Sequence, residues 1–177
     1  PVISLADGVV MGGGAGLMQA GSHAVVTEKT RFAMPESAIG LFPDAGASVF
    51  LGRCPRPLAL CLGMTGRIIG AADCLMLGLA SAMVPAESMM PLRAALLGCG
   101  AEEIDAVIGR FRADPGQAPL QAHRTEIEHI FSGDDPVAMR ERASDLAQVK
   151  ASQTGADIHH ALALSLIHIS EPTRPNE

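Results

Sequence analysis

The chain has 177 residues, of which 48% are hydrophobic and 18% are charged, so a folded domain with a sizeable core is expected rather than a disordered chain. A net charge of −6 without basic clusters excludes nucleic acids and anionic membrane surfaces as partners. No apolar run approaches the ~20 residues that span a bilayer. The four cysteines form no C-x-x-C pair, so neither a disulfide framework nor a metal site is predicted.

Short apolar runs between turn signals predict strands in the first part of the chain. These strands are expected over residues 2–8, 23–29 and 31–35. Between the first two lies "VVMGGGAGLMQAG", residues 9–21, in which three consecutive glycines precede small and apolar residues. Such residues can open a buried helix, so a strand-to-helix connection is expected here.

Helices dominate the rest of the sequence, with one further strand expected over 81–85. Helices rich in small residues are expected over 47–54, 58–64 and 71–80. From about residue 88 the pattern is helical, and one apolar stripe is formed at helical spacing by Ile104, Val107, Ile108 and Phe111. Asp135 before Pro136 predicts an N-cap followed by proline at the first helical position. The predicted class is mixed α and β, with a helical C-terminal part.

Both ends of the chain are unusual. It opens with "PVISLADG", a strand already under way without an initiator methionine, so we expect a fragment truncated at both ends. The last stretch, "LSLIHISEPTRPNE", abandons the helical pattern, and its residues 164–174 resemble a translated sequencing adapter. The expected organisation is a core over 1–87, a helical region over 88–163 and an adapter-derived artefact over 164–177.

The glycine run fits no nucleotide-binding pattern. Gln19 stands where a G-x-G-x-x-G motif requires its last glycine, and no P-loop motif exists. One explanation is a tight strand-to-helix crossing in which only glycine fits. The other is a backbone that approaches a ligand and points its first helical N–H groups at a developing negative charge. The run alone favours the tight crossing.

Two carboxylates, Glu36 and Asp44, stand in the otherwise apolar or small stretch "MPESAIGLFPDAG", residues 34–46. Each directly follows a proline, and a turn or capping role would explain either one alone. Together, beside an oxyanion donor, they would supply a general base and an orienting group for acyl chemistry. The histidines form no H-E-x-x-H pattern and no G-x-S-x-G motif is present, so other hydrolytic motifs are not supported.

Three stretches resemble the enoyl-CoA hydratase/isomerase (crotonase) superfamily, and within it the 3-hydroxyisobutyryl-CoA hydrolase branch: "PVISLADGVVMGGGAGLM", "FAMPESAIGLFPDAGA" and "MTGRIIGAADCLMLGLAS". The resemblance covers about residues 1–147 and is densest over 1–85. It implies a crotonase-like spiral of ββα units followed by helices.

The resemblance also implies roles for single residues. Gly13 matches a backbone N–H donor of the family's oxyanion hole, Glu36 a catalytic carboxylate, and Asp44 the second acid of the hydrolases. Hydratases carry a glutamate where this chain has Gly16 and a glycine where it has Asp44. Because one of the two acids that add water across a double bond is missing, hydration is disfavoured.

The expected activity is therefore hydrolysis of an acyl-CoA thioester, 3-hydroxyisobutyryl-CoA, in valine degradation. No metal or other cofactor is expected, because CoA is part of the substrate. The alternatives are an enoyl-CoA isomerase or hydratase of the same fold, or an inactive fragment, since the other oxyanion donor of the family lies upstream of Pro1. A homo-oligomer is expected, cytoplasmic in a bacterium and mitochondrial in a eukaryote.

Overall fold

Strands and helices alternate through the first half of the chain, and helices follow up to residue 151, the last residue that the structure, a computed structural model, describes. The predicted mixed α/β class is confirmed. The chain divides into two units, one of residues 1–33 and 68–122, the other of residues 34–67 and 123 onward. The predicted division at residue 87 stays a prediction, and the segment 164–177 lies outside the described residues.

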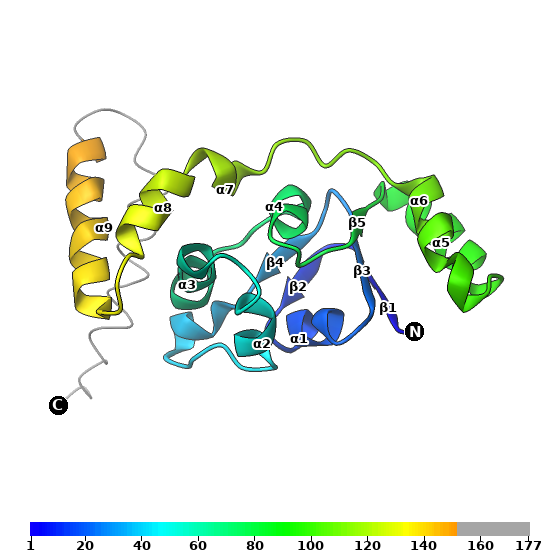
Figure 1. Cartoon of the computed structure of the whole chain (residues 1–177), viewed down its shortest axis with the longest axis horizontal. Coiled ribbons are helices and arrows are strands. Elements are labelled where there is room, and N and C mark those ends of the chain that lie inside the picture. The colour runs from blue at the N-terminus through cyan, green and yellow to red at the C-terminus, as the bar shows by residue number, and fades with distance from the viewer. Residues whose placement is uncertain (152–177) are drawn as a thin grey trace. The chain divides into compact units, whose positions relative to one another are not determined.

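Parallel strands organise the first unit (Figure 1). Its first elements are β1 (Ile3–Ala6), β2 (Val9–Met11), α1 (Gly13–Gln19), β3 (His23–Val26) and β4 (Arg31–Ala33), with β5 (Ala82–Met83) later in the chain. β1 pairs with β3, and β2 pairs with β4, in both cases in parallel. The first two strands of the chain thus run alongside the next two. β3 also pairs with β5, which gives the order β1-β3-β5.

The strands differ from the predicted ones in number and length. β2 was not predicted, because three residues beside a glycine run are too short to show a periodic pattern. β3 ends at Val26 rather than at residue 29, because a turn follows it. In this turn the N–H of Thr27 donates to Oγ1 of Thr30 at 2.9 Å, and the N–H of Thr30 donates to the carbonyl of Thr27 at 3.0 Å.

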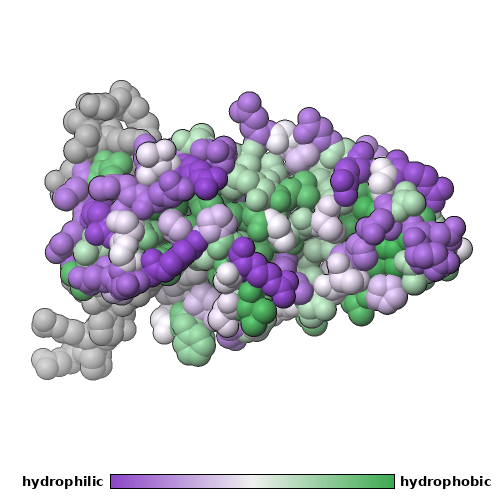
Figure 2. All heavy atoms as spheres, in the orientation of Figure 1, coloured by the Kyte–Doolittle hydropathy of each residue, from purple (hydrophilic) through white to green (hydrophobic). Residues whose placement is uncertain are grey.

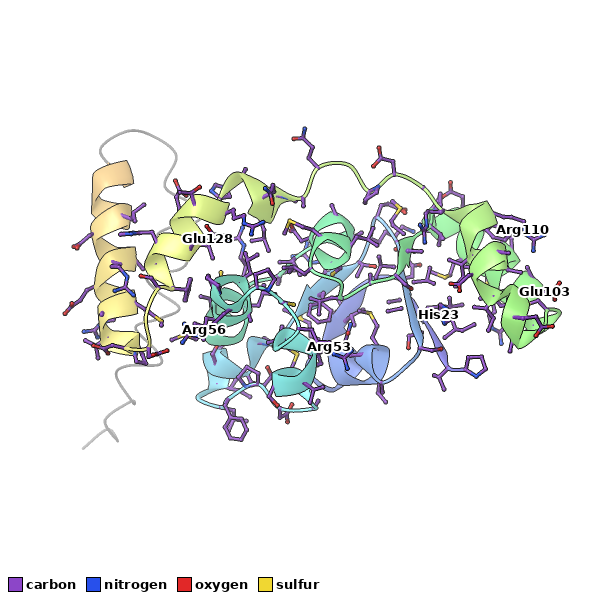
Figure 3. The ribbon with its side chains drawn as sticks, viewed as in Figure 1. His23, Arg53, Arg56, Glu103, Arg110 and Glu128 are labelled. Carbon is purple, nitrogen blue, oxygen red and sulfur yellow. The ribbon has the colours of Figure 1, made fainter. Side chains whose placement is uncertain are left out.

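Helices complete the first unit. They are α4 (Ala71–Met76), η2 (Ala86–Ser88), α5 (Met89–Leu97), η3 (Ala101–Glu103), α6 (Ile104–Phe111) and α7 (Pro119–Ala122). The predicted apolar stripe is confirmed, since Ile104, Val107 and Ile108 are buried in one cluster with Val25 of β3. Nε2 of His23, labelled in Figure 3, lies 3.2 Å from Oδ1 of Asp105 and links the start of β3 to α6.

The second unit contains η1 (Pro35–Ile39), α2 (Ala47–Leu51), α3 (Arg56–Thr65), α8 (Arg124–Ile130) and α9 (Pro136–Ala151). The predicted N-cap is confirmed, because Oδ1 of Asp135 accepts the N–H of Val137 at 2.9 Å. Two arginines hold the turn between α8 and α9. Arg56, labelled in Figure 3, donates to the carbonyl of Gly133 at 2.9 Å, and Arg142 donates to that of Ile130 at 3.0 Å.

The surface mixes polar and apolar residues, and Figure 2 shows hydrophobic groups among hydrophilic ones on the face in view. Large exposed side chains include Leu41 and Phe42, which lie between the two candidate acids. Within residues 1–151, no helix combines the length and the apolar character needed to cross a membrane.

Candidate active site

Glu36 lies in the first turn of the short helix η1. Pro35 starts this helix with a φ angle that suits a first helical position. The helix ends at Gly40 in the left-handed conformation, and the carbonyl of Glu36 accepts the N–H of Leu41 at 3.0 Å. The backbone on both sides of Glu36 is therefore fixed by local sequence.

The side chain of Glu36 is buried, with the residue only 8% exposed. Its Oε2 atom has no hydrogen-bond partner among the described residues, and the same holds for Oγ of Ser37. Buried polar atoms without partners are destabilising, and a carboxylate more so than a neutral group. A solvated turn residue is thereby excluded for Glu36, which instead carries a buried carboxylate oxygen without a partner in the described part of the chain.

Asp44 has a different environment, in an exposed turn before α2. Its backbone carbonyl accepts the N–H of Ala47 at 2.8 Å, so Asp44 does take part in a turn. Ala45 and Gly46 follow with φ angles of 47° and 81°, both left-handed. This geometry leaves the carboxylate of Asp44 at the surface, where it can meet a polar group of a substrate.

Gly13 is the first residue of α1 and directly follows Gly12, the N-cap of this helix. Gly12 requires glycine because its φ is 51°. A Cβ atom added to Gly13 or Gly14 would meet nothing within 4 Å. The tight crossing therefore explains Gly12 only. At Gly13 the backbone is exposed, and its N–H belongs to the first turn, where helical N–H groups lack an intrahelical acceptor.

The three predicted residues are distributed over both units. Glu36 and Asp44 belong to the same unit, within residues 34–67, whereas Gly13 belongs to the other. The roles assigned to them from the sequence stay predictions. The sequence did not single out Ser37, whose buried hydroxyl next to Glu36 has no signal in the sequence, because a serine after Pro-Glu is typical of any helix start.

Two other candidate nucleophiles, Cys61 and Ser22, are poorly placed for catalysis. Burial raises the pKa of the Cys61 thiol to about 12, so the reactive thiolate is not formed near neutral pH. Ser22 contacts Nδ1 of His23 at 3.0 Å, but its hydroxyl donates to the carbonyl of Val2. Asp105, on the other side of His23, has a side chain that is 92% exposed. These three side chains form a surface link rather than a buried triad.

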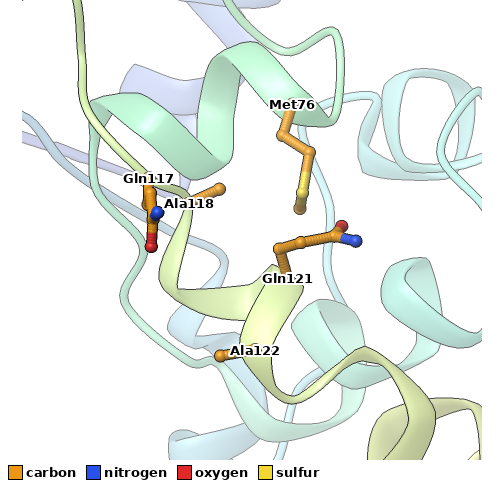
Figure 4. A pocket seen from close by; sticks show the side chains of 5 residues that line it. All are labelled: Met76, Gln117, Ala118, Gln121 and Ala122. Atoms are coloured by element: carbon orange, nitrogen blue, oxygen red, sulfur yellow. The ribbon is translucent and has the colours of Figure 1, made fainter.

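A hollow of about 570 Å³ lies at α4 and α7 (Figure 4). It is lined by Met76, Gln117, Ala118, Gln121 and Ala122. None of these side chains is a general base or a nucleophile at neutral pH, so the hollow by itself offers no catalytic group.

Proteins of similar sequence provide independent evidence on the family of the chain. The chain is 47% identical over 94 residues to 3-hydroxyisobutyryl-CoA hydrolase 1 of Arabidopsis thaliana, a match that covers 53% of the chain and 25% of that protein. It is 36% identical over 149 residues to the mitochondrial 3-hydroxyisobutyryl-CoA hydrolase of Xenopus tropicalis, covering 80% of the chain and 39% of the relative. The chain thus spans between a quarter and two fifths of the length of these relatives.

Solved structures give the same result for the fold. The crystal structure of a carnitinyl-CoA dehydratase from Mycobacterium thermoresistibile matches 95% of the chain and 46% of its own length, with a TM-score of 0.81 and 29% identity. The predicted crotonase-like fold is confirmed. A sequence model described as enoyl-CoA hydratase/isomerase matches residues 1–173. The chain therefore belongs to the enoyl-CoA hydratase/isomerase family.

Proposed function

We propose that the protein containing this chain hydrolyses an acyl-CoA thioester, with 3-hydroxyisobutyryl-CoA as its substrate. The observation that carries the proposal is the buried carboxylate of Glu36, whose Oε2 has no partner within the described part of the chain. The names of the relatives described above, at 36–47% identity, support the same reaction.

In the proposed mechanism, the N–H of Gly13 stabilises the negative charge that develops on the thioester oxygen. Glu36 either removes a proton from the attacking water or attacks the carbonyl carbon itself. The carbon–sulfur bond then breaks, and CoA leaves as a thiol with a proton that comes from the water. Where Glu36 itself attacks, water hydrolyses the anhydride that Glu36 forms with the acyl group and regenerates the carboxylate. Asp44 binds the 3-hydroxyl group of the substrate, and such a site discriminates strongly against substrates without that hydroxyl. Backbone donors and carboxylates suffice for these steps, so no metal or redox cofactor is proposed.

The test is release of free CoA thiol by the full-length protein that the complete reading frame encodes. Glu36→Gln is expected to lower kcat by about 10²–10⁴-fold, the usual contribution of a general base. Its matched control is Glu87→Gln, because Glu87 also lies in the first turn of a 3-10 helix but is exposed. A Glu36→Gln variant that releases thiol at the wild-type rate would contradict the proposal.

The role of Asp44 is tested by substrate choice. Asp44→Asn is expected to raise KM for 3-hydroxyisobutyryl-CoA but not for isobutyryl-CoA, which lacks the hydroxyl. Asp114→Asn, an exposed aspartate, is the control.

The alternative activity, which an acid at the position of Asp44 would also serve, is a double-bond shift. Conversion of a 3-enoyl-CoA without release of thiol would support that isomerase instead.

Assembly and compartment belong to the same proposal. A homo-oligomer is proposed, and the mass of the full-length protein in solution tests it. The Xenopus tropicalis relative is named as mitochondrial. A mitochondrial location is therefore proposed for a eukaryotic source and a cytoplasmic one for a bacterial source.

A further inference from the structure

Gly63 in α3 and Gly66, which caps this helix, lie against the prolines that precede the two candidate acids. A Cβ atom added to Gly66 would lie 3.0 Å from Cα of Pro35. A Cβ atom added to Gly63 would lie 3.6 Å from Cγ of Pro43. Each candidate acid is thus the direct neighbour of a proline that contacts α3.

Gly63 lies in the last turn of α3, and Gly66 is the left-handed capping residue that directly follows the helix. The surface that these two glycines form at the end of α3, which we call the Gly63–Gly66 face, contacts both the segment that carries Glu36 and the segment that carries Asp44. A common support fixes where the two segments stand relative to each other, although eight positions of chain separate the acids.

The C-terminal turn of α3 is well suited to such a role, because its own hydrogen bonds fix it. The hydroxyl of Thr65 donates to the carbonyl of Cys61 at 2.6 Å and accepts the N–H of Arg67 at 3.2 Å. The N–H of Gly66 donates to the carbonyl of Leu62 at 3.0 Å. Cys61 and Leu62 are themselves buried, so this turn is anchored in the core of its unit.

The contacts at the two glycines differ in tightness. Gly66 has a φ of +62°, and an added Cβ would also lie 3.2 Å from the carbonyl oxygen of Met34 and 3.3 Å from Oγ of Ser37. A side chain there would push the backbone that begins η1. At Gly63 an added Cβ would lie 3.6 Å from both Cγ of Pro43 and Cδ1 of Leu51, which are ordinary van der Waals contacts. A methyl group therefore fits, but a longer side chain would press on both residues.

We propose that the Gly63–Gly66 face is the positioning element of the active site, with Gly66 positioning Glu36 and Gly63 positioning Asp44. The inference rests on the proposed function, because it takes Glu36 and Asp44 as the reacting and the hydroxyl-binding acid. Neither glycine touches the substrate. Each acts through the proline that it contacts.

The first test compares Gly66→Ala with Gly133→Ala in the full-length protein. Gly133 belongs to the same unit and has a φ of +71°, but an added Cβ would meet nothing within 4 Å. Both variants place an alanine at a left-handed φ, and Gly66→Ala adds the contact with Pro35, so it is expected to lower the urea midpoint of unfolding more than Gly133→Ala. Only Gly66→Ala is expected to lower kcat, by about tenfold or more with KM within about twofold, because small misplacements of a reacting group cost rate.

The second test uses size at Gly63. Gly63→Ala is expected to leave both kinetic constants unchanged, whereas Gly63→Leu raises KM for 3-hydroxyisobutyryl-CoA by about tenfold. KM for isobutyryl-CoA is expected to stay constant in both, because that substrate has no hydroxyl for Asp44. If Gly63 had only a structural role, KM would rise for both substrates.

The outcomes separate the two proposals. If Glu36→Gln inactivates the protein but Gly66→Ala behaves like Gly133→Ala, the positioning role is wrong and the proposed function stands. If Glu36→Gln retains the wild-type rate, the proposed function itself fails. Should Gly66→Ala not fold, the pair of Gly63 variants decides, and equal KM values in both would overturn the inference.

Discussion

The carboxylate of Asp73 in α4 accepts a hydrogen bond from the backbone N–H of Leu120 in α7, with 2.9 Å between oxygen and nitrogen. The two residues are 47 positions apart, and Asp73 is only 2% exposed. The bond satisfies one of the N-terminal N–H groups that a helix leaves without an internal acceptor. It therefore fixes α7 to α4 in the first unit.

Replacement of Asp73 by alanine is expected to destabilise the protein by about 2–3 kcal/mol, because the buried N–H of Leu120 loses its acceptor and a cavity forms. Urea unfolding measures the change. Asp114→Ala is the control, since Oδ1 of Asp114 also accepts a backbone N–H, that of Gly116, but at an exposed site. Equal losses in the two variants would show that burial of the bond is unimportant.

Removal of the Ser37 hydroxyl is expected to stabilise the protein by up to about 1 kcal/mol, because Ser37→Ala eliminates a buried oxygen without a partner. Ser81→Ala provides the contrast. Oγ of Ser81 donates to the carbonyl of Ala24 at 2.9 Å and accepts its N–H at 3.1 Å, so this variant should be less stable than the wild type. Thermal unfolding of both variants checks the opposite signs.

The Cys61 thiol is expected to make the free energy of unfolding fall as the pH becomes alkaline. Burial, partly offset by the positive charge of Arg67, raises the pKa of its thiol from 9.0 to about 12. The folded chain thus holds this proton more tightly than the unfolded chain. The stabilisation that the protonated Cys61 thiol contributes to the folded state is complete below pH 9. It is lost as the pH rises from 9 toward 12, with a slope of at most about 1.4 kcal/mol per pH unit.

Urea unfolding at pH 8 and at pH 10 measures this loss, and the absence of tyrosine removes one other group that titrates in this range. Cys61→Ala is expected to flatten the dependence between the two pH values, whatever its effect at pH 8. An unchanged slope in that variant would assign the alkaline loss to other groups.

Ala45 is the one non-glycine residue with a positive φ among residues 1–151. This conformation is unfavourable by about 1–2 kcal/mol for residues with a side chain, whereas glycine adopts it freely but is more disordered when unfolded. Ala45→Gly is therefore expected to stabilise by up to about 1 kcal/mol. Ala94→Gly, an exposed position inside α5, is expected to destabilise by about 1 kcal/mol. Chemical unfolding of both variants decides whether Ala45 is strained.

The arrangement of elements could largely be predicted from sequence, because it depends on local periodicity and turn residues. The apolar stripe of α6 and the cap at Asp135 were predicted and confirmed. The strand β2 was missed, and the end of β3 was placed too late. The reason is that hydrogen bonds between Thr27 and Thr30 end this strand, and threonine otherwise favours strands.

The sequence proposes the residues of the candidate site, and their roles stay predictions, but it could not predict their environments. The sequence places Glu36 and Asp44 after prolines in nearly identical settings, yet Glu36 is buried and Asp44 is exposed. Solvent exposure depends on packing by other segments, which sequence patterns do not show. The left-handed conformation of Ala45 is equally invisible, because alanine is not enriched there.

The parallel order β1-β3-β5 has a consequence for the way the first unit folds. Pairing of β1 with β3 joins residues 20 positions apart, whereas pairing of β3 with β5 joins residues 57 positions apart. The longer loop costs roughly 1 kcal/mol more in closure entropy. We therefore expect the β1–β3 pair to form first and β5 to add to it afterwards. Substitutions in β5 should mainly accelerate unfolding, while those in β1 should slow folding itself.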